Sequence, residues 1–336
     1  MRTLVTLGLT FFLFSLREFC PVGADGWYLA ELVATGSDGF FYRSLLTVEL
    51  HRWVYRVVQP WGLDSWNAIA LSSALAGALA VQTLWALRRD GWFLALNIGT
   101  GAFLVFVGHV ENYAWVNTFL LLSFYYAKAW IEGRWRAWPV ALFYVLASLA
   151  HMLAVFYLPA FVYLFWRKRD YHPLELVLPA LLFSLVLSLA PLFGTLLGTD
   201  NGLERLVPWF TTWAKNHYFT FASAAHLKML AYFHQRAAYF GCLSLPFPIA
   251  GLETVWYDPV LYLGVPLELP LLVFLRRRIQ GLYLRFLLVA SLCGLAWTTI
   301  WHPDWGPMDW DLFSQFAIPL HLLLGLVLRP ETRVSE

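Results

Sequence analysis

Residues Pro139–Trp166 read PVALFYVLASLAHMLAVFYLPAFVYLFW, an apolar stretch with basic residues at both ends. Arg134 and Arg136 precede the stretch, and the basic residues 167–169 follow it. One membrane-spanning helix needs about 20 apolar residues, and its basic flanks stay in the cytoplasm. A single crossing would put one basic cluster on the wrong side. The stretch therefore predicts two short helices that enter and leave the membrane on the same side, with His151 near the turn; one long tilted helix is the alternative.

The composition of the chain points to the same class of protein. Of its 336 residues, 60% are hydrophobic and 13% are charged, whereas ordinary soluble domains carry about 25% charged residues. So few charges cannot build a water-facing surface, which excludes a soluble globular enzyme, a disordered protein and a nucleic-acid-binding module. The 18% aromatic content, with 18 Trp, predicts broad aromatic belts and, with the turn near His151, a cavity facing a sugar or a lipid. The 3 cysteines lack the spacing of a zinc site or a disulfide framework.

Further apolar runs predict additional spans, and the Lys and Arg at their ends orient them. With the hairpin counted as two, we expect about ten membrane segments, both termini in the cytoplasm and an all-α polytopic integral membrane fold.

Segment 225–251 is interrupted by charged residues and prolines, so it predicts interfacial helices, with another pair of spans as the alternative. A cleaved signal peptide is the alternative for the first run. The runs are about Thr3–Pro21, Ser65–Leu87, Trp92–Gly108, Tyr113–Ile131, Pro173–Phe193, Trp256–Leu275, Gly281–Trp301 and Leu312–Leu328.

A short predicted outer loop, GHVENY at residues 108–113, joins two of these apolar runs. His109, Glu111 and Asn112 place an imidazole, a carboxylate and an amide at the membrane surface, where ionisable groups are functional candidates. A carboxylate against an apolar wall has a raised pKa and can act as a general base on a hydroxyl group. The alternative is that Glu111 and Asn112 only cap the helix that follows.

A second short outer loop, WHPDWGPMDWDLF at residues 301–313, combines tryptophans with carboxylates. Asp309, Trp310 and Asp311 suit a sugar, because the apolar faces of sugar rings stack on indoles and their hydroxyls donate to carboxylates. The alternative is an aromatic belt with an acidic cap on the last span.

The first and longest predicted outer loop, residues 22–64, supplies further candidates. Asp25 and Asp38 each precede a glycine, so a turn is the alternative to catalysis for both. Basic residues on the translocated side go against the usual bias, and a lipid phosphate is an obvious partner for Arg43 or Lys215. Snorkelling to lipid headgroups is the alternative. The basic outer residues are Arg43, Arg52, Arg56, Arg205, Lys215, Lys228 and Arg236.

Taken together, these features resemble the GT-C superfamily of polytopic membrane glycosyltransferases. In that superfamily a first span is followed by a long outer loop with amphipathic helices and an acidic residue, and a short second outer loop carries another acid. Here Asp25 matches the first acid and Glu111 the second. The block His109–Tyr113, His151 and the block Asp309–Phe313 also resemble a group of bacterial membrane proteins of this type.

The resemblance implies transfer of a sugar from a polyprenyl-phosphate-linked donor to a lipid, glycan or protein acceptor on the outer face of a bacterial inner membrane, with inversion at the anomeric carbon. It implies one integrated membrane domain, with a catalytic module over 1–193 and interfacial helices and C-terminal spans over 194–336. A carboxylate removes the acceptor proton, and a basic residue holds the leaving phosphate. The implied roles are general base for Asp25 or Asp38, acceptor orientation or assistance to the base for Glu111 with His109, phosphate contact for His151 with Arg43 or Lys215, and sugar binding for Asp309 and Asp311.

The main alternative from another class is a transporter, which predicts ionisable residues within spans and repeat symmetry. No internal repeat is visible, and Glu268 alone lies deep in a predicted span. A membrane acyltransferase or hydrolase using His109 or His151, and a purely structural assembly factor, are further alternatives. The sequence contains no Walker loop, dinucleotide-binding glycine pattern or HExxH motif, so it identifies no particular cofactor. A divalent metal at the outer carboxylates stays open, and no nucleic acid partner is expected.

Overall fold

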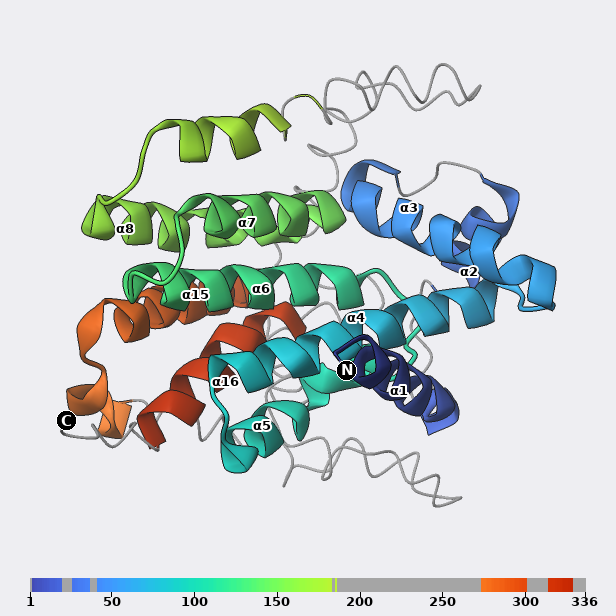
Figure 1. Cartoon of the computed structure of the whole chain (residues 1–336), viewed down its shortest axis with the longest axis horizontal. Helices are drawn as coiled ribbons and strands as arrows, with labels where there is room; N and C mark the ends of the chain where they lie inside the picture. Colours follow the sequence, from blue (N-terminus) through green and yellow to red (C-terminus); the bar gives the residue numbers. More distant parts are fainter. Residues whose placement is uncertain are drawn as a thin grey trace.

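The computed structural model describes residues 2–19, 26–36, 41–182, 185, 273–300 and 314–328, and every regular element in these ranges is a helix. The all-α class is therefore confirmed for this part of the chain. Long helices lie side by side to form the body of the molecule (Figure 1). They are α4 (Ser65–Leu87), α6 (Tyr113–Ile131), α7 (Trp138–Ala150), α8 (Leu158–Lys168) and α15 (Gly281–Ile300), with α1 (Arg2–Ser15), α5 (Gly91–Ile98) and α16 (Ser314–Leu328) packed beside them.

An aromatic centre holds α6, α8 and α15 together. Phe124, Phe161 and Phe286 come one from each helix, and all three are fully buried. The Phe124 ring stacks on the Phe161 ring with centroids 6.1 Å apart, and the Phe286 ring meets their edges at 5.6 and 5.3 Å. Aromatic pairs of this geometry add about 0.5–1.5 kcal/mol each to the free energy gained by burial. Residues far apart in the sequence are thus joined in one core.

Two predicted runs have the same bounds as helices α4 and α6. The helix α4 begins where the Asp64 carboxylate accepts a hydrogen bond from the Asn67 backbone N–H at 2.8 Å. It ends before Arg88, whose backbone is extended. Apolar runs bounded by a capping aspartate and by arginines therefore indicate helix ends as well as helix type.

The stretch 139–166 forms a helical hairpin, as its basic flanks predict. Helix α7 ends at Ala150, His151 is extended, and a 3₁₀ segment, η4 (Met152–Tyr157), leads into α8. The two arms pack against each other, with the rings of Tyr144 and Phe161 stacked at 4.2 Å. The alternative of one long tilted helix is wrong, because the backbone reverses at His151.

Two other predicted spans differ from the structure. The run Trp92–Gly108 is not one helix, because α5 ends at Ile98 and a separate 3₁₀ segment, η3 (Gly101–Phe106), follows. The sequence Gly-Thr-Gly at 99–101 causes the break, since glycine and β-branched residues disfavour a helix interior. The first run, Thr3–Pro21, is helical only to Ser15, followed by a 3₁₀ turn, η1 (Arg17–Phe19).

Among the helices described, α4 alone is long and apolar enough to cross a membrane by itself. Shorter apolar helices accompany it at Thr3–Ser15, Trp138–Ala150, Gly281–Trp297 and Ser314–Leu328. The predicted run Pro173–Phe193 is described at 173–182 and 185, and residues 174–182 are helical. The run Trp256–Leu275 is described only from residue 273, and segment 225–251 lies outside the described residues.

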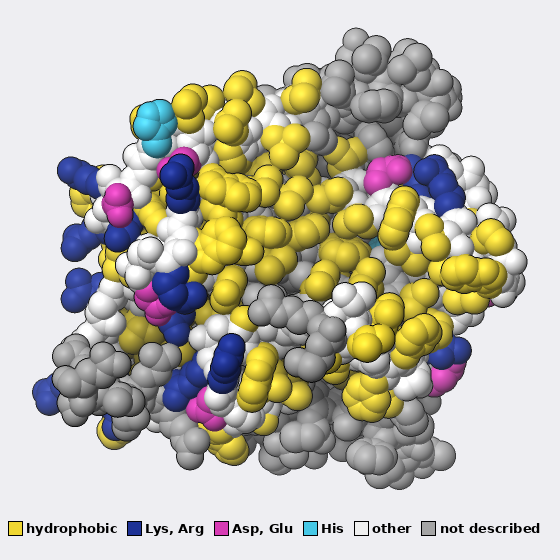
Figure 2. Space-filling view, viewed as in Figure 1, with side chains coloured by type: hydrophobic (Ala, Val, Ile, Leu, Met, Phe, Trp, Pro, Cys, Tyr) yellow, Lys and Arg dark blue, Asp and Glu magenta, His cyan; other side chains and the backbone are white. Residues whose placement is uncertain are grey.

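One end of the helix body, called here the basic end, collects the basic residues. Hydrogen bonds join the helix termini there: Lys128 Nζ donates to the Leu87 carbonyl at 3.1 Å, and Trp130 Nε1 donates to the Asp170 carbonyl at 3.0 Å. Figure 2 shows Lys and Arg gathered along this edge, with apolar side chains over the middle of the face. The basic end includes Arg88, Arg89, Lys128, Arg134, Arg136, Arg167, Lys168, Arg169, Arg276, Arg277 and Arg278.

Two further helices cover the opposite end of α4 (Figure 1). They are α2 (Gly26–Thr35) and α3 (Phe41–Val58), and α3 is kinked at Ser44. Both come from the predicted first outer loop. Their apolar faces pack on α4, with Leu29, Val33 and Val48 buried beside Ile69.

Candidate functional site

The backbone of the GHVENY loop is held tightly between helices. Gly108 has a φ of +69°, and a Cβ atom there would lie 2.5 Å from the Cβ of Arg17. This position therefore requires glycine, both for its left-handed conformation and for the close approach. On the next residue, the His109 carbonyl accepts a hydrogen bond from the Ser73 hydroxyl of α4 at 2.7 Å. The loop is consequently a rigid part of the fold.

The three polar side chains of this loop are buried. His109, Glu111 and Asn112 are 2%, 4% and 5% exposed. Asn112 occupies the cap position of α6, but its side chain makes no capping hydrogen bond, and its Oδ1 has no partner among the described residues. The capping interpretation of Asn112 is therefore wrong. A buried amide oxygen without a partner is a group that awaits a water molecule or a ligand.

Helix α3 contributes a buried histidine to the same region. His51 is fully buried beside the backbone of Glu111, and neither ring nitrogen makes a well-formed hydrogen bond. Burial lowers the pKa of His51 to about 4, and the Glu111 backbone offsets this only in part. His51 is therefore neutral at pH 7. The adjacent Arg52 is also buried, and its Nη1 donates to Glu49 Oε1 at 2.6 Å.

The tip of the α7–α8 hairpin reaches the loop from another direction. The Nδ1 of His151 accepts a hydrogen bond from the Leu153 backbone N–H at 3.2 Å, which leaves Nε2 as the protonated nitrogen of a neutral ring. The His151 ring packs against Tyr113, with centroids 5.3 Å apart. Thr47 of α3 donates to the Ala150 carbonyl at 2.9 Å. Hydrogen bonds and ring packing thus join α3, the loop and the hairpin tip.

These contacts define a buried polar cluster at the end of the bundle away from the basic end. It brings together four residues predicted from the sequence and adds two that were not among the predicted site residues. Arg43 lies in the first turn of α3, but its side chain is outside the described part. Asp25, Asp38, Lys215, Asp309, Trp310 and Asp311 also lie outside the described residues. The buried polar cluster is His51, Arg52, His109, Glu111, Asn112 and His151.

Sequence reasoning missed His51 because it stands in the stretch VELHRWVYR, which reads as an exposed amphipathic helix. It also missed Asn117 and Gln315, which are isolated amides inside apolar runs and are buried in the structure. The cost of placing a polar side chain within a membrane segment is the signal that could have identified both amides.

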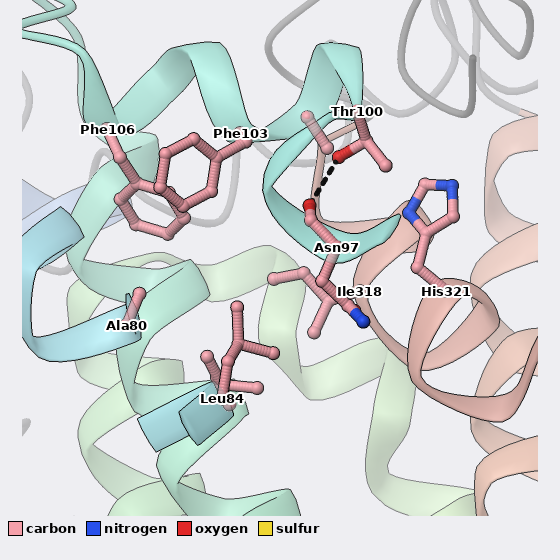
Figure 3. A pocket seen from close by; sticks show the side chains of 10 residues that line it. Ala80, Leu84, Asn97, Thr100, Phe103, Phe106, Ile318 and His321 are labelled. Atoms are coloured by element: carbon pink, nitrogen blue, oxygen red, sulfur yellow. Dashed lines mark hydrogen bonds between the residues drawn. The ribbon is translucent and has the colours of Figure 1, made fainter. Parts of the chain in front are cut away.

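A small cavity lies at the break between α5 and η3. Its volume is about 30 Å³, enough for one or two water molecules. Asn97, Thr100 and His321 line its polar side (Figure 3), and the Thr100 hydroxyl donates to the Asn97 carbonyl at 3.0 Å. The predicted cavity was expected at the hairpin turn, whereas this one lies where the run Trp92–Gly108 is interrupted.

The described residues contain no group of three or more His, Cys, Asp and Glu side chains arranged to hold a metal ion. In comparisons with known proteins, no family model, no curated protein and no solved structure matches the chain. The site's own geometry therefore provides the argument about function.

Proposed function

We propose that the chain is an integral membrane glycosyltransferase of the GT-C type, which moves a sugar from a polyprenyl-phosphate donor to an acceptor. The observation that carries the proposal is the buried polar cluster, in which the Glu111 carboxyl group, the Asn112 amide and three imidazoles are buried at the end of the bundle opposite the basic end, with Arg52 also buried on α3. A transferase acting on a lipid-linked substrate needs such a site beside the membrane surface.

The surface of the molecule supports a place in the membrane. Helix α4 has 23 residues, which corresponds to about 34 Å and is close to the thickness of the hydrocarbon layer. Exposed tryptophans lie towards both ends of the bundle, as in the aromatic belts of membrane proteins. Trp27, Trp53 and Trp61 stand in or just after α2 and α3, near the polar cluster. Trp85, Trp92, Trp135, Trp138 and Trp166 stand at or beside the ends of α4, α5, α6, α7 and α8 that form the basic end.

The side of the membrane follows from the basic end. Loops rich in Lys and Arg remain in the cytoplasm, so the polar cluster faces outwards, in a bacterial inner membrane with both chain termini inside. Exposed apolar side chains between the two ends then face lipid; Phe11, Val162, Leu178 and Leu292 are examples.

The proposed reaction inverts the anomeric carbon. The acceptor hydroxyl passes its proton to a carboxylate while its oxygen forms a bond to the anomeric carbon. The bond from that carbon to the phosphate oxygen breaks, and its electron pair leaves with the polyprenyl phosphate. Asp25 or Asp38 acts as the base, and Glu111 with His109 orients the acceptor.

The leaving phosphate requires hydrogen-bond donors and positive charge. His151 Nε2 supplies a donor, together with Arg43 or Lys215, and the buried Arg52 adds a positive charge on α3. Because His51 is neutral, it places no positive charge beside the acceptor. Asn112, Asp309, Trp310 and Asp311 bind the hydroxyl groups and faces of the sugars.

The test is sugar transfer by the purified protein in lipid nanodiscs, using a panel of radiolabelled polyprenyl-phosphate hexoses. We expect Asp25→Asn and Glu111→Gln to lower the rate by about 100-fold or more, because general acid–base groups contribute about 10²–10⁴-fold and misplacing the acceptor costs about 100-fold. The matched control is Glu132→Gln, at an exposed glutamate of the basic end. Full activity of both site variants, or no transfer by the wild type from any donor, would refute the proposal.

A further inference from the structure

A second set of buried polar side chains lies in the contact between α6 and α16. Asn117, Ser314 and Gln315 are at most 3% exposed, as is Tyr157 from η4. The side chains of Asn117 and Ser314 are joined by a hydrogen bond from Nδ2 to Oγ at 2.8 Å. This contact between the two helices is called here the amide seam.

The Gln315 backbone carbonyl in the amide seam has a hydrogen-bond partner from outside its own helix. Pro319 has no N–H, so the Gln315 carbonyl cannot receive the usual helical hydrogen bond. The Tyr157 hydroxyl donates to that carbonyl instead, at 2.9 Å. Tyr157 is itself held in place by α15, because a Cβ atom on Gly294 would lie 3.0 Å from its hydroxyl oxygen. The carbonyl that Pro319 leaves without its helical partner is therefore satisfied without using the Gln315 side chain.

The amide side chains, in contrast, have unused hydrogen-bonding capacity. Gln315 Oε1 and Nε2 and Asn117 Oδ1 are buried and make no hydrogen bond within the described structure. More than nine-tenths of buried polar groups in proteins have a partner, because leaving one without a partner is costly. An amide with both polar atoms unused therefore indicates that something outside the described chain binds there.

The amide seam continues the buried polar cluster into the bundle. Asn117 follows Asn112, whose own Oδ1 is unsatisfied, by five positions, which corresponds to about 7.5 Å along a helix axis and about 140° around it. Gln315 follows Asp311 by four positions in the sequence. The segment η4 links the two regions, because it begins next to His151 and ends at Tyr157, whose hydroxyl is bonded to the Gln315 carbonyl.

The chemistry of the amide seam selects a neutral ligand. Within α6 and α16 the only Asp, Glu, Lys or Arg is Lys128, which lies at the basic end, and η4 has none. Amides provide donors and acceptors without charge, so they match hydroxyl groups, which also do both. We propose that Asn117 and Gln315 form a subsite that binds hydroxyl groups of the transferred sugar, an inference that rests on the proposed function.

The test measures binding of two kinds of synthetic lipid to the full chain in nanodiscs. One is farnesyl phosphate, and the other is farnesyl phosphate linked to a hexose, prepared with several different hexoses. Wild type should bind at least one farnesyl-phosphate hexose more tightly than farnesyl phosphate. Gln315→Met keeps the side-chain length but removes both polar atoms. It should weaken binding of that hexose form by about 10-fold, leave farnesyl phosphate binding unchanged and not lower the unfolding temperature. The matched control is Gln82→Met, whose amide is already bonded to the Thr6 hydroxyl; it should keep the preference.

The outcomes separate the two proposals. If the wild type binds neither lipid, the proposed function fails, and the subsite fails with it. If the wild type prefers the hexose form and Gln315→Met keeps that preference, or if the wild type binds both lipids equally, the subsite alone is overturned. A Gln315→Met protein that unfolds at a lower temperature or fails to fold also overturns it, because the amide would then be a structural group.

Discussion

Both ends of the helix bundle contain polar and charged residues, but these are paired near the surface at one end and buried at the other. At the basic end, charges are paired near the surface: Arg134 with Glu132, and Lys168 with Asp170. In the buried polar cluster, His51, Glu111 and Asn112 are withdrawn from water, and the ring nitrogens of His51 and Oδ1 of Asn112 make no well-formed hydrogen bond within the described residues. Surface ion pairs stabilise a fold very little, whereas buried polar groups cost free energy. The contrast makes the end with buried polar groups the candidate site, because those groups cost free energy that the surface pairs do not.

The largest difference between the ends should appear in catalysis. His151→Asn removes the donor proposed to contact the leaving phosphate, so we expect the transfer rate to fall by about 100-fold. His172→Asn, at an exposed histidine of the basic end, should leave the rate unchanged. Steady-state rates of sugar transfer measure both. Equal rates for the two variants would remove the distinction between the ends.

The pH dependence of stability should also come from the cluster. The pKa of His51 is about 4 in the folded chain, below its ordinary value of 6.5. Between these values the unfolded chain binds a proton that the folded chain does not, so stability is complete above about pH 6.5 and falls as the pH drops towards 4. The loss should approach about 3 kcal/mol.

Unfolding temperatures in nanodiscs between pH 4 and 8 test this expectation. His51→Phe should give a flatter profile than the wild type, and His172→Gln should keep the wild-type profile. A His51→Phe protein with an unchanged profile would show that another group is responsible.

Two glycines with left-handed backbones allow a direct comparison of the ends. Gly108 has a φ of +69° and lies against Arg17, whereas Gly133 at the basic end has a φ of +74° and no neighbour within 4 Å. Alanine at either position should cost about 1 kcal/mol for its conformation. At Gly108 the overlap with Arg17 should add about 2 kcal/mol. Thermal unfolding of Gly108→Ala and Gly133→Ala measures the difference, and equal destabilisation would mean that the loop is not tightly held.

The smallest effect should come from the paired charges of the basic end. Arg134 is half exposed, and exposed ion pairs contribute about 0–1 kcal/mol. Arg134→Ala should therefore change the unfolding temperature by no more than about 2 °C for a chain of this size. A loss as large as that of Gly108→Ala would contradict the view that this end is a solvated surface.

Helix positions were easier to predict than the site. The apolar run of α4 lies between Asp64 and Arg88, which mark the two ends of the helix. The apolar run of α6 begins at Tyr113, the last residue of the GHVENY loop. The hairpin could be predicted because basic residues flank both ends of Pro139–Trp166, and both flanks are expected on the same side of the membrane. The break in the run Trp92–Gly108 was missed, because hydropathy alone hides the effect of Gly99 and Thr100 on the backbone.

The site could be predicted only where the polar residues stand close together in the sequence. His109, Glu111 and Asn112 predict a site because they stand together between two apolar runs. His51 and Gln315 are single polar residues, and their burial arises from tertiary packing. The meeting of α3 with the hairpin tip, through Thr47 and the Ala150 carbonyl, depends on contacts between distant segments that no local pattern encodes.

The central claim is that the buried polar cluster and the basic end face opposite sides of a membrane. The direct measurement places single cysteines at Gln59 and Asp170, exposed residues near the two ends, in a chain with Cys20, Cys242 and Cys293 replaced by serine. A membrane-impermeant thiol reagent is then applied to whole cells. We predict that Gln59→Cys reacts in intact cells and that Asp170→Cys reacts only after permeabilisation. Labelling of both positions from the same side would contradict the account.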